Sequence, residues 1–235
     1  MDPLQKRAQR MLLWGLAGMV AFLVALAALH VIDFVWPTAG APEPGSRVLS
    51  GTEPRHISAY ALGHGGPVWY AGVVCLGLGM MAFAMGLKRL LPRVRNSVAS
   101  CWLLFAAGCS MLLLDVFPTD ATPMPTTPWG ALHDIAAISS LTLQCSAMVL
   151  LSESGSRNPA WQQVVGSSPA WSAVATVLSI GWGFMDILPA PGWEFGAVAQ
   201  RAVAVFLVYW MLMVGWRARW VVQSTAATSA STPTG

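Results

Sequence analysis

The chain has 235 residues, of which 55% are hydrophobic and only 10% are charged, and its mean hydropathy is +0.58. These values exclude an ordinary water-soluble domain, in which about a quarter of the residues are charged. The net charge is only +3, and no basic patch interleaved with aromatic residues indicates a nucleic-acid partner. The composition therefore predicts an integral membrane protein whose partners are membrane lipids.

Six apolar stretches are each long enough to cross a hydrocarbon core of about 30 Å, which takes about 20 helical residues. They lack the alternation of barrel strands. In chain order, the predicted helices cover approximately residues 11–35, 67–87, 97–117, 129–151, 170–189 and 196–217. No linker divides them, so we expect an all-α, polytopic six-transmembrane-helix bundle that forms one domain over residues 1–221. The Ser/Thr/Ala-rich tail, 222–235, is predicted to be disordered.

The first apolar stretch follows Lys6, Arg7 and Arg10, which is also how a secretory signal peptide begins. Its length of about 25 residues exceeds the 7–15 residues that are usual for a cleavable signal core. We therefore expect residues 11–35 to be retained as the first transmembrane helix.

The basic residues orient the helices, because cytoplasmic loops carry an excess of Lys and Arg. With the N-terminus inside, only Arg47, Arg55 and Arg201 fall on the outer side, and the other ten of the thirteen basic residues fall on the cytoplasmic side. The predicted topology places both termini in the cytoplasm.

The acidic residues show the opposite bias. Eight of the ten lie at or beyond the predicted outer ends of helices: Asp33, Glu43, Glu53, Asp115, Asp120, Asp134, Asp186 and Glu194. Acidic residues contribute little to topology, so the rule that orients the helices does not explain this clustering. The pattern favours a polar region on the outer side.

Three of these aspartates belong to a recurring pattern of an apolar residue, an aspartate, two or three apolar residues and a proline. It occurs as IDFVWP at 32–37, LDVFP at 114–118 and MDILP at 185–189. The spacing is about one helical hairpin, which is consistent either with three related hairpins or with chance recurrence in apolar sequence. A carboxylate near hydrocarbon costs free energy, so three at equivalent depths predict a shared polar environment.

No cofactor and no metal are predicted. Cys75, Cys101, Cys109 and Cys145 fall inside apolar stretches without CxxC spacing, so they read as small hydrophobic residues. The chain also lacks HExxH or a comparable zinc-ligand spacing. His30 and His133 lie at depths where a haem could be held, but nothing else indicates one.

Several short motifs resemble the bacterial membrane family catalogued as domain of unknown function 998. They are FPTD at 117–120, PWGALHDIAA at 128–137, SAYA at 58–61 and GAVAQR at 196–201, with Trp210 later in the last helix. The resemblance covers nearly the whole chain and implies six helices in a bacterial cytoplasmic (inner) membrane. The family pattern has an acidic residue where this chain has Ala59. The resemblance implies no activity.

The outer polar residues carry the functional hypothesis. We expect a site that binds or modifies a lipid headgroup or another small molecule, formed by Asp33, Ser58, Asp115, Asp120, His133, Asp186 and Arg201. The alternatives are a structural protein whose outer acids only stabilise helix junctions, a metal-dependent membrane hydrolase, and a small-molecule transporter. Catalysis is not implied by any motif.

Two expectations about this site can be compared with a structure. His133 should face the bundle interior and meet the LDVFPTD turn at 114–120, because a ring facing lipid would forfeit its hydrogen bonds. Asp115 lies in the last turn of its helix, where the helix dipole disfavours a negative charge. A nearby cation, a bound metal or a raised pKa would relieve this conflict, and Arg201 is the outer cation that a helix holds in place.

Overall fold

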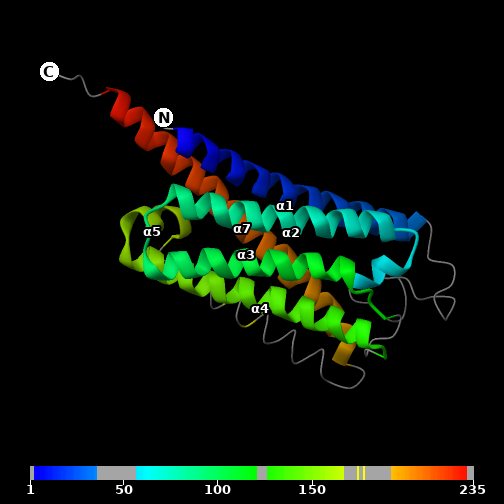
Figure 1. The fold of residues 1–235 in the computed structure, drawn as a ribbon. Coiled ribbons are helices and arrows are strands. Elements are labelled where there is room, and N and C mark those ends of the chain that lie inside the picture. The colour runs from blue at the N-terminus through cyan, green and yellow to red at the C-terminus, as the bar shows by residue number, and fades with distance from the viewer. Residues whose placement is uncertain are drawn as a thin grey trace.

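A computed structural model describes residues 3–35, 57–120, 126–166, 174, 177 and 192–231 (Figure 1). The described elements are α1 (Pro3–Val35), the 3₁₀ helix η1 (Ile57–Leu62), α2 (Gly66–Leu90), α3 (Arg95–Val116), α4 (Pro128–Arg157), α5 (Pro159–Val165) and α7 (Gly192–Ser231). These elements are all helical, and no strand occurs within the described residues. The predicted all-α, polytopic membrane fold is confirmed.

Within the described part of the chain, five helices are long and apolar enough to cross a membrane: Pro3–Ile32, Gly66–Leu90, Arg95–Val116, Pro128–Arg157 and Gln200–Ser224. They correspond to five of the six predicted spans. The predicted span at 170–189 lies outside the described residues, apart from Val174 and Val177, which are helical. The six-helix bundle therefore stays a prediction. The third aspartate motif, at 185–189, also lies outside the described residues.

From α1 to α4 each helix runs antiparallel to the one before it, and α7 runs in the same direction as α4, so α1 and α3 finish at the end of the bundle where α2, α4 and α7 begin (Figure 1). We call this the outer end, after the predicted orientation, and the opposite end the inner end. α2 packs against both α1 and α3, and α3 packs against α4. In Figure 1, α7 crosses the other long helices obliquely, behind α2 and α3.

The α1–α2 pair is held at close range by glycines. A Cβ added at Gly79 would lie 3.1 Å from Gly18 Cα, and one added at Gly86 would lie 2.8 Å from the backbone nitrogen of Leu12. Small residues let helix backbones approach, and the resulting dispersion contacts drive helix association in lipid, where the hydrophobic effect between helices is weak. The glycines therefore set the spacing of this hairpin.

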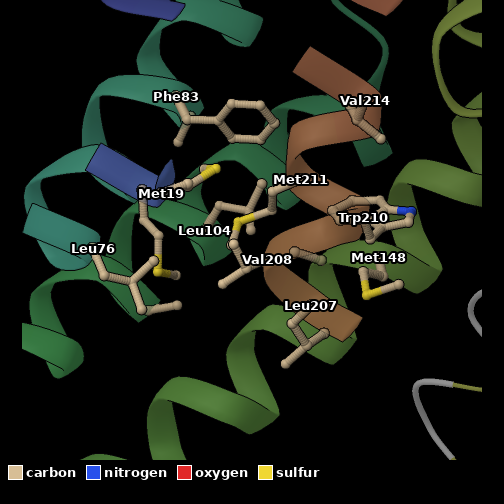
Figure 2. Close-up of a cluster of buried hydrophobic side chains, with 14 of the residues drawn as sticks. Met19, Leu76, Phe83, Leu104, Met148, Leu207, Val208, Trp210, Met211 and Val214 are labelled. Carbon is tan, nitrogen blue, oxygen red and sulfur yellow. The ribbon is translucent and has the colours of Figure 1, made fainter. Parts of the chain in front are cut away.

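The core is formed where α7 enters the bundle (Figure 2). Its side chains are large and apolar, and they come from five helices: Met19 of α1, Leu76 and Phe83 of α2, Leu104 of α3, Met148 of α4, and Leu207, Val208, Trp210, Met211 and Val214 of α7. Because α7 contributes half of these labelled residues, it joins elements that are distant along the chain.

The short helix α5 closes the inner end and was not predicted. Asn158 caps it by accepting a hydrogen bond from the backbone N–H of Ala160 at 3.0 Å, and Gly166, with φ of 77°, ends it. Trp161 is buried, and its Nε1–H donates to the carbonyl of Pro92 at 2.9 Å. Seven residues are too few for a hydrophobic period, so the Asn-Pro cap was the only available signal.

The last helix is longer than expected. We predicted disorder from residue 222, whereas α7 continues as helix to Ser231. A residue added to an existing helix costs no new nucleation, and Ala226 and Ala227 have the highest helix propensity. Composition alone favours disorder here because it takes no account of the preceding membrane span.

The predicted orientation can be tested by labelling. A membrane-impermeant maleimide applied to intact cells should react with a cysteine introduced at Ser50 but not with one at Ser156, because the ten-to-three split of basic residues places 37–66 outside. The four native cysteines are first replaced by alanine, and permeabilised cells provide the positive control for Ser156→Cys. If intact cells label Ser156→Cys but not Ser50→Cys, the protein has the opposite orientation to the predicted one.

Candidate functional site

The turn between α3 and α4 is organised around the carboxylate of Asp120. Its Oδ2 accepts hydrogen bonds from the backbone N–H of Thr126 at 2.6 Å and of Thr127 at 2.9 Å. Its Oδ1 accepts from the hydroxyl of Thr127 at 2.8 Å. The hydrogen bonds from Thr127, and then from Thr126, hold the pKa of Asp120 below its usual value. Asp120 therefore fastens the start of α4 to the end of α3.

This arrangement requires a glycine in the first turn of α4. Thr127 is the N-cap, and its hydroxyl oxygen accepts from the backbone N–H of Gly130 at 3.0 Å. A Cβ at Gly130 would overlap Asp120 Oδ2 and would lie only 2.5 Å from Asp120 Cγ. The glycine thus makes room for the carboxylate.

His133 joins the same turn from the interior. Its side chain is 2% exposed, and its Nδ1 lies 2.8 Å from the carbonyl oxygen of Phe117. A carbonyl only accepts, so Nδ1 carries the hydrogen, and in the neutral ring Nε2 is left as an acceptor. The prediction that His133 faces inward and contacts the LDVFPTD turn is confirmed.

Asp115 is in a different situation from Asp120, although only five residues separate them. Both oxygens of its carboxyl group are buried, and neither has a hydrogen-bond partner among the described residues. The expected pairing with Arg201 is therefore not present as a hydrogen bond. Buried carboxylate oxygens without a partner are unfavourable, so this group calls for an explanation.

A second buried polar group without a partner lies on α2. The indole of Trp69 is 5% exposed, and its Nε1–H has no acceptor among the described residues.

The contact between α2 and α3 shows the depth of Trp69. The backbones of Gly77 on α2 and Gly108 on α3 adjoin, with a Cβ at Gly77 3.0 Å from the Gly108 carbonyl. Asp115 follows Gly108 by seven residues on α3, and Tyr70, the neighbour of Trp69, precedes Gly77 by seven residues on α2. With an equal rise of about 1.5 Å per residue, Trp69 and Asp115 lie at the same level.

The register of α4 brings His133 to this level too. The hydroxyl of Ser140 donates to the carbonyl of Ala107 at 3.1 Å. Asp115 follows Ala107 by eight residues on α3, and His133 precedes Ser140 by seven residues on α4. Three adjacent antiparallel helices therefore present Trp69, Asp115 and His133 near one depth, close to the outer end.

The start of α7 meets η1 at the same end. The backbone N–H of Ile57 donates to Gln200 Oε1 at 2.9 Å, which places Ser58 and Arg201 in neighbouring positions of these two elements. His30 of α1 packs against Tyr60 of η1 with ring centroids 5.5 Å apart. The structure thus brings Ser58 and Arg201 to the outer end, as expected for the predicted site.

The remaining predicted residues are not placed. The side chain of Asp33, on α1, and all of Asp186 lie outside the described part of the chain. Within that part, no three His, Cys, Asp or Glu side chains come together as ligands for a metal ion. That Asp33 and Asp186 belong to the site remains a prediction.

Sequence reasoning missed Trp69 and Gln200. Tryptophans near helix ends read as interface anchors, and Trp129, which is 56% exposed, fits that description. Trp69 has the same local sequence signal but faces inward, which only helix packing determines. Gln200 was part of the GAVAQR motif and could have been considered as a polar contact.

A groove of about 300 Å³ lies elsewhere, on the seam between α1 and α2. Its lining includes the small residues Ala21, Ala25, Ala71, Gly72 and Cys75. Ala21 and Ala71 are exposed, so the groove opens on the surface of the bundle. It contains none of the predicted polar residues and is distinct from the candidate site.

Comparison with known protein families places most of the chain in one of them. Residues 54–217 match the model of a family described as protein of unknown function (DUF998). The matched region contains η1, the α3–α4 turn, His133 and Arg201. No curated protein matches the chain, and no solved structure matches it.

Proposed function

This chain belongs to the DUF998 family of proteins of unknown function, and we propose that it binds a lipid headgroup or another small polar molecule at the outer end of the bundle. The observation that carries this proposal is the carboxyl group of Asp115, whose two oxygens are buried without a hydrogen-bond partner among the described residues. A bound polar group would satisfy them. Buried polar atoms in proteins are almost always hydrogen-bonded, and an exception calls for a functional explanation.

The proposal gains support from the neighbouring groups. Trp69 contributes an unpaired N–H, and the hydrogen bond from His133 to Phe117 leaves His133 Nε2 as an acceptor. Polar groups that three neighbouring helices present at one level are consistent with a small-molecule site. We propose that Ser58 and Arg201 belong to the same site, together with Asp33 and Asp186.

Asp120 is better explained by a structural role. Its oxygens are already occupied by donors of Thr126 and Thr127, so it has less to offer a ligand than Asp115. The structural reading of the outer acids thus accounts for Asp120 but not for Asp115. A binding site at Asp115, beside a turn fastened by Asp120, accounts for both.

A lipid is the favoured source of the ligand because of depth. Asp115 lies one residue before the end of α3, a helix that is apolar enough to cross a membrane. The end of such a helix lies close to the headgroup layer, where exposed tryptophans such as Trp129 are favoured. A headgroup can reach this level without leaving the bilayer.

Native mass spectrometry of the purified full-length protein in mild detergent tests the proposal. The wild-type protein should retain a bound molecule of defined mass, and Asp115→Asn should lose it while keeping its folded yield. Cys109→Ala, on the same helix but exposed, is the matched control and should retain the ligand. A wild-type protein without any bound molecule, or equal retention by Asp115→Asn, would contradict the proposed site.

A further inference from the structure

The unpaired groups at the outer end indicate which chemical class of ligand fits. We propose that the group received by Asp115 is a primary ammonium, carried by a molecule that also has an oxygen acceptor a few atoms away. This inference rests on the proposed function and specifies its ligand.

The first argument concerns the number of donors. Both Asp115 oxygens are buried and unfilled, so the ligand must supply at least two hydrogens to one small region. A hydroxyl supplies one hydrogen, whereas an ammonium supplies three. His133 Nε2, at the same level, is a further acceptor that a third hydrogen can satisfy.

The second argument concerns charge. Among the described residues, every lysine and arginine except Arg201 lies in the inner part of the bundle; they are Lys6, Arg7, Arg10, Lys88, Arg89, Arg93, Arg95, Arg157, Arg217 and Arg219. Arg201 makes no hydrogen bond to Asp115, whose oxygens have no described partner. A buried carboxylate is stable when a cation is paired with it. A ligand that carries its own positive charge supplies this pairing.

The third argument concerns the acceptor. The indole N–H of Trp69 can only donate, and its burial without a partner requires an acceptor from the ligand. Trp69 and Asp115 lie at one level on adjacent helices, so a single ligand that carries an ammonium and an oxygen acceptor would contact both helices at this level. An ethanolamine phosphate group has this arrangement, both in a membrane lipid and as a free molecule.

The proposal predicts discrimination against methylated amines. A trimethylammonium group has the same charge but no N–H, so it would leave both Asp115 oxygens without donors. The loss of one hydrogen bond to a charged group corresponds to about tenfold or more in affinity. Dioleoyl phosphatidylethanolamine and dioleoyl phosphatidylcholine differ only in these methyl groups and are the matched probes.

The experiment is a native mass spectrometry titration of the delipidated full-length protein with each lipid. The phosphatidylethanolamine should bind at least about tenfold more tightly than the phosphatidylcholine. Asp115→Asn should bring the two lipids to equal affinity, and Cys109→Ala should preserve the difference. If free ethanolamine phosphate displaces the lipid, a soluble molecule is supported as the carrier of the ammonium group. If it does not displace the lipid, a membrane lipid is supported as the carrier.

The negative outcomes separate the two proposals. Equal binding of both lipids by the wild-type protein, with loss of both in Asp115→Asn, would overturn the ammonium inference but leave a headgroup site. Absence of binding by either lipid and by free ethanolamine phosphate would overturn the ammonium inference. If the wild-type protein also purifies without a bound molecule, the proposed function fails with it. The lipid comparison in the wild-type protein needs no variant to fold.

Discussion

Gly18→Leu is expected to abolish the folded yield of the protein or to lower its thermal midpoint strongly. A Cβ at this position would overlap the carbonyl oxygen of Cys75 and would lie 2.9 Å from Gly79 Cα. Both are backbone atoms of α2, so no side-chain rotation relieves the overlap, and the two helices must separate. Overpacking in a core usually costs about 1–3 kcal/mol, and we expect the upper end or more here because the obstacle is backbone.

The measurement is the thermal midpoint and the monodisperse fraction in detergent. Ala27→Leu is the matched control, since Ala27 lies on the same helix but is exposed, and it should leave both quantities nearly unchanged. Gly18→Ala should fall between the wild-type protein and Gly18→Leu. A Gly18→Leu protein with the wild-type midpoint would show that α1 and α2 are not in this close contact.

Gly130→Ala is expected to destabilise the protein, against the general trend for helices. Replacing glycine by alanine in a helix usually stabilises it by about 1 kcal/mol. Here the added methyl group would displace the Asp120 carboxylate, with Cγ only 2.5 Å from the new Cβ, and so would remove its hydrogen bonds from Thr126 and Thr127. The sign of the change in thermal midpoint is therefore the diagnostic result.

A double-mutant cycle isolates the cause. If Gly130→Ala acts by displacing the carboxylate, it should cost much less in an Asp120→Ala background, where the carboxylate is already absent. Thermal midpoints of the four proteins provide the comparison. Additive effects, or a stabilised single variant, would show that Asp120 does not occupy the space beside Gly130.

The pH dependence of this turn has a defined sign. Because the donors of Thr127 and Thr126 lower the pKa of Asp120 in the folded protein, its contribution to stability is complete above the unfolded pKa of about 3.9. It is lost as the pH falls below that value and through the folded pKa. The difference in midpoint between the wild-type protein and Gly130→Ala should thus be constant near neutral pH and should shrink only in strong acid.

The helices themselves could be predicted closely from local sequence. The predicted starts of the second and fourth spans, residues 67 and 129, lie within one residue of Gly66 and Pro128, where α2 and α4 begin. Hydrophobic length determines that a span exists, and proline in the first turn marks where both helices begin, with the Thr127 cap as a further signal at α4. These are properties of consecutive residues, which is why the sequence alone was sufficient.

The site depended on information that consecutive residues do not contain. Asp115 and Asp120 belong to one short motif, and the sequence does not distinguish them. The carboxylate of Asp120 accepts hydrogen bonds from Thr126 and Thr127, whereas the oxygens of Asp115 are buried without a partner among the described residues. Trp69 and Trp129 likewise share a position near helix ends, but only Trp69 faces inward. Composition and hydropathy by themselves determined the membrane fold, and the distribution of the basic residues predicted an outer location for most of the acids. Only the tertiary structure decided which polar groups are satisfied, because hydrogen-bond partners depend on the rotation and register of helices that are distant along the chain.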